Sequence, residues 1–360
     1  MFIGIDCFCD DEIRSMILSS SIKGKCDITG KENVFIYDTE SCDTSLSDYL
    51  SELIDVYTPE SELISFPKEK LASIEVVLKR DWSIFTVSES EIKIILIEVC
   101  KKVYPSNSKV YSERVGLEEL GNIDYMEEFC LTKRFSWNEF VDSLKTINRF
   151  HSTHINLKQL KRLFENPCFR NEIPKGVSRF CRGRISDSLL KPREMWAPPV
   201  EKVVAGRANS SGIRCLYLAG DEETALHEIR ARDLDIISIG VFETKHKSTI
   251  VDLANLDQIS PSRVKDVFTY EWLAINMPVL KKMSKEIAKP LRRQDSELDY
   301  LPSQYISDYI KSLGYDGIQY KSTLHIDGMN YAIFNQKKFK CIDVYCVQVL
   351  SLKYKSMRIM

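Results

Sequence analysis

The feature that most constrains the fold of this 360-residue chain is a change in its hydrophobic pattern near Pro174. Before that point, apolar side chains recur about every 3.6 residues, the spacing of a helix with one buried face. After it, short runs of β-branched and aromatic residues are separated by turn-forming residues, which is typical of strands. We therefore expect two domains, an all-α domain at residues 1–171 and an α+β domain at residues 172–360.

The two patterns also locate the principal elements. In the first half, the helical spacing predicts helices at residues 92–103, 137–150 and 157–164. In the second half, the predicted strands lie at residues 180–185, 215–219, 236–242, 248–253, 317–321, 331–335 and 341–349. Helices are expected between these strands, at residues 221–232, 273–289 and 304–313.

The composition is that of an ordinary soluble protein. Hydrophobic residues make up 44% of the chain, charged residues make up 28%, and the formal net charge is −2, so no long-range attraction to nucleic acid or to an anionic membrane is expected. The 11 cysteines are dispersed, which favours free thiols in a reducing compartment over a disulfide framework. The sequence has no run of about 20 apolar residues and no signal-peptide pattern at its start. We expect a cytoplasmic protein with no membrane partner.

Four segments of the second half carry side chains suited to a chemical site. They are Phe180–Ile185, which contains Arg-Gly-Arg; Gly206–Asn209; Leu216–Ala219 followed by Glu223–Glu228; and Tyr320–Ser322 followed by Gly328–Asn330. Taken alone, each segment has an ordinary explanation as a solvated strand edge, a core strand, a surface helix or a turn. The glycine-rich loops of dinucleotide-binding and P-loop proteins do not occur in the sequence.

In their order and spacing, these segments resemble the RES family, which is named for its Arg, Glu and Ser. The resemblance extends from about Phe180 to Phe334 and is greatest to RES proteins that carry a helical, HEPN-like N-terminal domain. It implies a fold like that of the ADP-ribosyltransferase toxins, with NAD⁺ bound in a cleft of a split β-sheet. The implied activities are NAD⁺ hydrolysis, NAD⁺ phosphorolysis or ADP-ribosyl transfer to a protein. Many family members are toxins paired with an antitoxin, so a role as a toxin or defence effector is implied here.

Carried over residue by residue, the resemblance implies particular site residues. The implied catalytic residues are Glu228, Arg182 and Ser322. The implied NAD⁺-binding residues are Arg182, Arg184, Arg207, Tyr217, Asn209, Ser322 and Asn330. The sequence leaves open which of the first two arginines is the principal one. Where many members have an aromatic residue after the Gly-Arg pair, this chain has Ala208.

These residue types suit the chemistry of NAD⁺. Arginine forks bind phosphate oxygens through paired hydrogen bonds and could hold the pyrophosphate without a glycine-rich loop. A tyrosine ring such as that of Tyr217 offers a face to the cationic nicotinamide. Cleavage of the nicotinamide–ribose bond builds positive charge on the ribose, which a fixed carboxylate at Glu228 would stabilise. NAD⁺ is expected as the substrate, and no metal is expected.

Other patterns in the sequence suggest different sites. Cys7, Cys9 and Cys26 invite a zinc interpretation, but the paired Cys-x-x-Cys spacing of a structural zinc site is missing. Arg149 and His154 match the Arg-x4-His pattern of HEPN ribonucleases, so the N-terminal domain is either a ribonuclease or a sensor and interaction module. The basic stretch at residues 281–293 is typical of a solvated helix face, with a docking surface for an acidic partner as the alternative.

The sequence does not identify the group that receives the ADP-ribosyl moiety. Water, inorganic phosphate and a protein side chain are all compatible with the residues named above. The antitoxin or regulatory partner and the oligomeric state, including a homo-oligomer, are likewise open.

Overall fold

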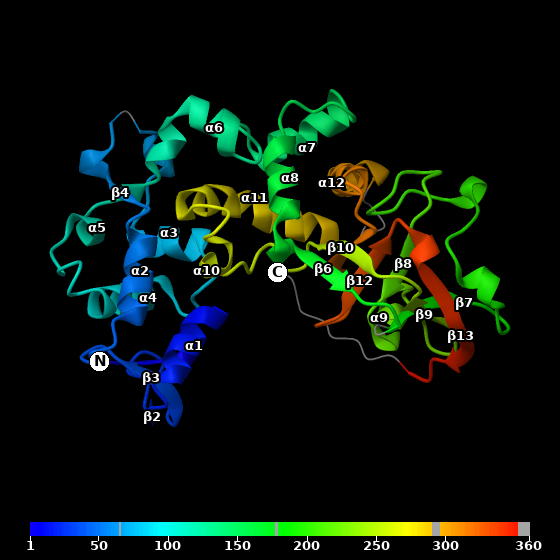
Figure 1. Ribbon diagram of the computed structural model, residues 1–360, viewed down its shortest axis with the longest axis horizontal. Helices are drawn as coiled ribbons and strands as arrows, with labels where there is room; N and C mark the ends of the chain where they lie inside the picture. The colour runs from blue at the N-terminus through cyan, green and yellow to red at the C-terminus, as the bar shows by residue number, and fades with distance from the viewer. Residues whose placement is uncertain (65, 177–178, 290–295, 352–360) are drawn as a thin grey trace, which may run out of the picture. The chain divides into compact units, whose positions relative to one another are not determined.

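The computed structural model describes residues 1–64, 66–176, 179–289 and 296–351 (Figure 1). Arg292 and Arg293, at the end of the basic stretch, lie outside the described residues. The chain forms two compact units, which we describe separately. The first unit comprises residues 1–137, 153–160 and 257–281, and the second comprises residues 138–152, 161–256 and 282–360. The domain boundary at residue 171 stays a prediction.

The first unit contains strands as well as helices. Its strands are β1 (Phe2–Gly4), β2 (Lys23–Gly24), β3 (Val34–Asp38), β4 (Thr58–Pro59) and β5 (Val115–Gly116). Its helices are α1 (Asp11–Ser19), α2 (Ser45–Ile54), α3 (Ile74–Asp81), α4 (Glu89–Val99), α5 (Lys109–Ser112), α6 (Ile123–Phe129) and α10 (Pro261–Val264). Both units contribute residues to α7 (Trp137–Thr146), α8 (Leu157–Glu165) and α11 (Tyr270–Ala288).

The expectation of an all-α N-terminal domain is therefore wrong. A three-stranded antiparallel sheet in the order β1-β3-β2 and a two-stranded β4-β5 pair lie in this region. Most of these strands have two or three residues, which is too short for an alternating pattern to become visible. The longest, β3, has the β-branched and aromatic sequence Val-Phe-Ile-Tyr, which is typical of a strand.

The second unit is built on one large mixed sheet. Within the described residues the sheet has eight strands in the order β13-β9-β7-β8-β12-β11-β10-β6. Their bounds are β6 (Arg170–Ile173), β7 (Arg179–Ile185), β8 (Leu216–Ala219), β9 (Ile236–Thr244), β10 (Ser248–Asp252), β11 (Gly317–Lys321), β12 (Met329–Ile333) and β13 (Phe339–Gln348). The pair β10–β11 is parallel, and the other neighbouring pairs are antiparallel. The predicted α+β character of this half is thereby confirmed.

The sheet opens between its two central strands. Strand β7 pairs with β9 along its whole length, from Arg179 to Ile185. With β8, by contrast, β7 shares the single register pair Cys181–Ala219. The two halves of the sheet thus diverge at the β7–β8 junction, and α9 (Glu222–Glu228) follows directly after β8 at this opening.

The core of the second unit lies on both sides of this junction. One cluster includes Phe180, Leu216, Leu218 and Phe242, from β7, β8 and β9. A smaller cluster, around Ile237 and Ile239, packs against the side chains of α9 and β13. Because the neighbouring strands are anchored in these clusters, the backbone around the opening is held in place.

Several elements differ in length from their sequence-based predictions, α9 and α12 among them. The helix expected at residues 221–232 ends at Glu228, and Arg230 then adopts a left-handed conformation with φ of 52°. The last helix, α12, spans Leu301–Ser312 and begins three residues earlier than expected. No helix within the described ranges is both long and apolar enough to cross a membrane.

Candidate active site

A cavity of about 380 Å³ lies at the β7–β8 opening of the second unit. Its walls come from segments that are far apart in the sequence. They are formed by Cys181, Arg182, Gly183, Gly206, Arg207, Tyr217, Leu218, Ala219, Ala225, Glu228, Ile229, Arg230, Tyr300, Tyr320, Leu324 and Asn330. The opening of the sheet thus provides a pocket lined by two arginines predicted to bind NAD⁺ and by the glutamate predicted to be catalytic.

Arg182 projects from β7 into the opening. Its Nη1 donates a hydrogen bond of 3.2 Å to the carbonyl oxygen of Tyr217, a backbone group of the diverging strand β8. Its Nε is buried and has no hydrogen-bond partner among the described residues. Burial lowers the pKa of Arg182 to about 10, and the charge of Arg184 acts in the same direction. The guanidinium remains charged at neutral pH, so the cavity wall carries a cation with an unused donor.

Arg207 supplies a second cation on another wall of the cavity. Its side chain is 8% exposed, and its guanidinium carbon lies 5.7 Å from the centre of the Tyr320 ring. Its buried Nη1 finds no hydrogen-bond partner in the described part of the chain. An unsatisfied buried donor costs about 1–3 kcal/mol, and more when it is charged. This arrangement is typical of a group whose partner is a bound anion.

The turn that carries Arg207 is fixed by Tyr217. The Tyr217 hydroxyl donates to Asn209 Oδ1 at 2.6 Å and accepts from the Ala208 backbone N–H at 3.0 Å. Burial raises the pKa of Tyr217 well above its ordinary value, so the phenol keeps its proton and its donor role. Gly206 is needed at this turn because a Cβ there would lie 2.6 Å from the Tyr217 hydroxyl oxygen.

Helix α12 holds the same turn from its other side. Gln304 Nε2 donates to the carbonyl oxygens of Gly206 and Asn209, at 2.8 and 2.9 Å. The Ser303 hydroxyl donates to the carbonyl oxygen of Arg207 at 2.8 Å. These bonds satisfy the turn's buried backbone groups and set the direction in which Arg207 enters the cavity.

Replacement of Gly206 by alanine should therefore destabilise the site. Because the added Cβ would overlap both the Tyr217 hydroxyl and Asn209 Oδ1, we expect the free energy of unfolding to fall by about 1–3 kcal/mol. Urea denaturation measures this change. Gly220→Ala is the matched control, since a Cβ at Gly220 would make ordinary contacts at 3.6 Å or more. Equal stability of the two variants would show that the turn can rearrange.

Glu228 is the acidic group of the cavity, and two neighbours fix its orientation. Its Oε1 accepts hydrogen bonds from the Ser322 hydroxyl, at 2.7 Å, and from Asn330 Nδ2, at 2.8 Å. Across residues 1–64, 66–176, 179–289 and 296–351, no donor contacts Oε2. One carboxylate oxygen is thus anchored to the protein while the other remains available to a bound molecule.

Ser322 is itself held by the loop that follows it. Its Oγ accepts hydrogen bonds from the backbone N–H groups of Leu324 and His325, both at 3.1 Å. With both donors directed at this oxygen, the Ser322 proton is directed at Glu228. In the structure Ser322 positions Glu228, and it is not among the residues that line the cavity.

Comparison with known proteins supports the assignment of this half of the chain. The family model described as the RES domain matches residues 184–355. This part of the chain is a RES domain. The match begins at Arg184, so Arg182 precedes it by two residues and its assignment depends on the geometry of the cavity. The family model does not cover the N-terminal region, and membership of the subgroup with a helical N-terminal extension stays a prediction.

Two further comparisons give little additional information. No curated protein matches the chain. Among solved structures, the crystal structure of the M. tuberculosis MbcT–MbcA toxin–antitoxin complex aligns with 53% of this chain and 91% of its own, at 10% identity and a TM-score of 0.31. A similarity this weak does not establish a shared fold.

The RES domain brings together only some of the residues predicted to bind NAD⁺. Arg182, Arg207, Tyr217 and Asn330 line the cavity beside Glu228. Two other predicted residues are engaged elsewhere. The Arg184 guanidinium donates to the carbonyl oxygen of Glu194, and the side-chain nitrogen of Asn209 donates to Val204 and Ser210 carbonyls. Direct contact of these two with a ligand stays a prediction.

Sequence reasoning missed several residues that shape the RES-domain cavity. Ser303 and Gln304 hold the arginine-bearing turn, and Tyr300 and Tyr320 add aromatic surface. Of these residues, only Tyr320 could have been found from the sequence, because it lies two residues before Ser322 in one of the four segments that resemble the RES family. The polar pair in α12 carries no recognisable motif and becomes meaningful only when the structure places it against the turn.

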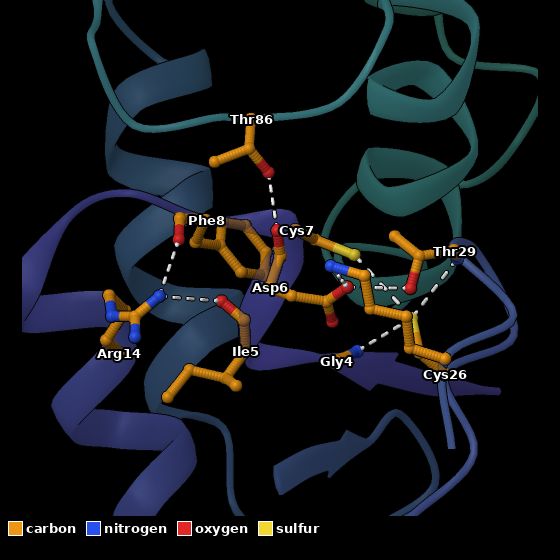
Figure 2. Close-up of polar contacts among 10 residues, drawn as sticks. Gly4, Ile5, Asp6, Cys7, Phe8, Arg14, Cys26, Thr29 and Thr86 are labelled. Atoms are coloured by element: carbon orange, nitrogen blue, oxygen red, sulfur yellow. Dashed lines mark hydrogen bonds and ion pairs between the residues drawn. The ribbon is translucent and has the colours of Figure 1, made fainter. Parts of the chain in front are cut away.

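The cysteines considered for zinc lie in the first unit, outside the RES domain. Figure 2 shows Cys7 and Cys26 side by side, with their sulfur atoms 3.7 Å apart. Cys26 Sγ also accepts the backbone N–H groups of Gly4 and Thr29, at 3.1 and 3.4 Å. Cys9 is directed elsewhere, since its thiol donates to the carbonyl oxygen of Ser83 at 3.2 Å.

Of the carboxylate beside these two thiols, Asp6 Oδ2 is already engaged, whereas the buried Oδ1 has no hydrogen-bond partner among the described residues. Asp6 accepts a hydrogen bond of 2.8 Å from the Thr29 hydroxyl (Figure 2). It also forms an ion pair of 3.1 Å with Lys31. Asp6, Cys7 and Cys26 could offer three ligand atoms to a metal, but an ammonium group supplies the compensating charge here. The absence of zinc at these cysteines therefore stays a prediction.

The residues considered for a ribonuclease have ordinary surroundings. The His154 ring packs on Phe135, with the ring centres 3.9 Å apart, and Arg149 is exposed. No feature of these surroundings favours RNA cleavage. The ribonuclease and sensor alternatives for the N-terminal region stay predictions.

Proposed function

We propose that the RES domain consumes NAD⁺ by cleaving the bond between nicotinamide and ribose. The observation that carries this proposal is the joint presence of an oriented carboxylate, Glu228, and two arginines with unused buried donors around one cavity. Membership of the RES family gives the proposal independent support. The fold would then be of the ADP-ribosyltransferase type, with the opening between β7 and β8 as the split of the sheet.

In this proposal the arginines bind the pyrophosphate. Arg182 Nε and Arg207 Nη1 are donors without partners among the described residues, and pyrophosphate oxygens would satisfy them. Because both groups are largely buried, their attraction to phosphate is screened less than it would be at the surface. The proposed role of the arginines is binding and orientation of NAD⁺, with the reacting bond directed toward Glu228.

The proposed role of Glu228 is to stabilise the charge that develops as nicotinamide leaves. The hydrogen bonds from Ser322 and Asn330 hold one carboxylate oxygen, so the other can approach the ribose without reorganisation. The C–N bond electrons leave with nicotinamide, and an acceptor then attacks the cationic ribose carbon. Tyr217 and Tyr320 offer aromatic surface to the nicotinamide ring. An enzyme of this kind would act as a toxin or defence effector restrained by an antitoxin or another regulatory partner.

The direct test is product analysis after incubation of the full chain with NAD⁺. Mass spectrometry of reactions with and without inorganic phosphate, and with and without cell extract, distinguishes the acceptors. Nicotinamide with ADP-ribose indicates hydrolysis, ADP-ribose phosphate indicates phosphorolysis, and a protein carrying the mass of ADP-ribose indicates transfer. Intact NAD⁺ under all four conditions would overturn the proposal.

A further inference from the structure

Two histidines and a glutamate meet beside the cavity without taking part in the proposed reaction. Glu223 and His227 lie four residues apart on α9, so their side chains share one face of the helix. His325 comes from the loop after Ser322, about one hundred residues later in the chain. The three side chains can each offer one ligand atom, and these atoms lie within 4.8 Å of one another.

The hydrogen bonds around His325 fix which ring nitrogen is available. The Thr224 hydroxyl donates to Asp221 Oδ2 at 2.8 Å, because the carboxylate can only accept. The Thr224 oxygen must then accept from His325 Nδ1, which lies 2.8 Å away. The neutral His325 ring is therefore protonated at Nδ1 and has its lone pair at Nε2, which lies 3.6 Å from Glu223 Oε1. Histidine ligands of metals are commonly oriented by such a hydrogen bond from their other nitrogen.

The loop geometry that brings His325 to this position depends on Gly328. A Cβ at Gly328 would lie 2.7 Å from Thr224 Oγ1 and 3.0 Å from His325 Nδ1. The His325 ring stacks on the His227 ring, with an interplanar angle of 5° and centres 5.1 Å apart. Two parallel imidazoles and an adjacent carboxylate form a donor set suited to zinc and similar transition metals.

We propose that Glu223, His227 and His325 form a binding site for a transition-metal ion of the Zn²⁺ type. Ligands at about 2.1 Å from a tetrahedral metal lie about 3.4 Å apart, close to the separation of His325 Nε2 and Glu223. The ring of His227 is exposed, and its ligand atom lies within 4.8 Å of the other two. An ion pair between a protonated His325 and Glu223 is the alternative, but it leaves the stacked His227 without a role.

A metal ion at this site would act on the cavity through the loop. The backbone N–H of His325 donates to Ser322 Oγ, and Ser322 donates to Glu228. His227 and Glu228 are adjacent in α9. The metal would clamp the loop at residues 322–328 onto α9 and would limit movement of the carboxylate-positioning serine. This inference concerns metal binding and holds whether or not the cavity cleaves NAD⁺.

Cobalt titration of the full chain tests the proposal, because the visible spectrum of Co²⁺ distinguishes its ligands. We expect one equivalent of Co²⁺ to bind with the d–d absorption of imidazole and carboxylate ligation and without a thiolate charge-transfer band. His227→Ala should lower this affinity at least ~10-fold, since a ligand is lost outright. His246→Ala, which removes another exposed histidine of the same unit, should leave the affinity unchanged.

The second variant addresses the orientation of His325. Thr224→Val keeps the side-chain shape but removes the oxygen that accepts from Nδ1, so Co²⁺ affinity should fall about 10- to 100-fold. Melting curves recorded without metal check that each variant is folded. A folded His227→Ala variant with wild-type Co²⁺ affinity, or binding with a thiolate spectrum only, would overturn the proposal.

Discussion

A Glu228→Gln variant should turn over NAD⁺ about 100- to 1,000-fold more slowly than the wild type, with little change in NAD⁺ affinity. The amide retains the shape of the side chain, and its oxygen can still accept from Ser322 and Asn330. The change removes the negative charge directed into the cavity. Because the ribose becomes cationic only as nicotinamide leaves, this charge stabilises the transition state more than the bound substrate.

Steady-state kinetics with nicotinamide release as the readout separates kcat from KM. The matched control is Glu172→Gln, which makes the same chemical change at an exposed carboxylate of β6 that pairs with Lys247. The control should retain wild-type turnover. Near-normal kcat with a raised KM for Glu228→Gln would instead make Glu228 a ribose-binding group in the ground state, and the charge-stabilising role would be refuted.

The sequence was most informative about the domain family, because several segments that are distant in the chain occur together in the order typical of that family. The order of the arginine, tyrosine, glutamate and serine segments predicted a RES domain, and a family model matches residues 184–355. Strands such as β9 and β10 were predictable because β-branched and aromatic residues dominate them. These predictions succeeded because local composition and tertiary structure favour the same result.

The sequence was least informative about residues whose roles depend on tertiary contacts. Ser322 and Glu228 are 94 residues apart in the chain, and only the sheet topology shows that the serine acts by positioning the carboxylate. Similarly, periodicity predicted α12 but could not show that Gln304 binds the turn at Gly206, 98 residues away. Strands of two or three residues in the first unit were missed for a different reason, because they form through pairing and not through local preference.

The choice between Arg182 and Arg184 shows the same limit. Residues two apart on a strand project from the same face, so alternation alone makes the two arginines equivalent. The structure separates them by position along β7. Arg182 lies at the opening of the sheet, whereas the Arg184 guanidinium reaches the carbonyl oxygen of Glu194.

Arg207→Met should weaken NAD⁺ binding by about one to two orders of magnitude without a comparable loss of stability. A charged hydrogen bond to phosphate is worth about 1.5–3 kcal/mol, which sets the loss of affinity. Stability should behave differently because the wild-type protein buries the Arg207 Nη1 donor without a partner among the described residues. Methionine fills similar space and removes that unsatisfied charge.

Calorimetric titration with NAD⁺ and urea denaturation of the ligand-free protein measure the two effects. Arg207→Lys retains the charge but loses the planar fork, so its affinity should lie between those of the wild type and Arg207→Met. Arg193→Ala is the control for loss of an exposed arginine that does not line the cavity, and its affinity should be unchanged. If Arg207→Met lost stability and kept its affinity, Arg207 would be a packing residue of the turn. If Arg207→Met instead binds NAD⁺ more weakly but unfolds with an unchanged free energy, the buried charge of Arg207 contributes to ligand binding and not to the stability of the ligand-free protein.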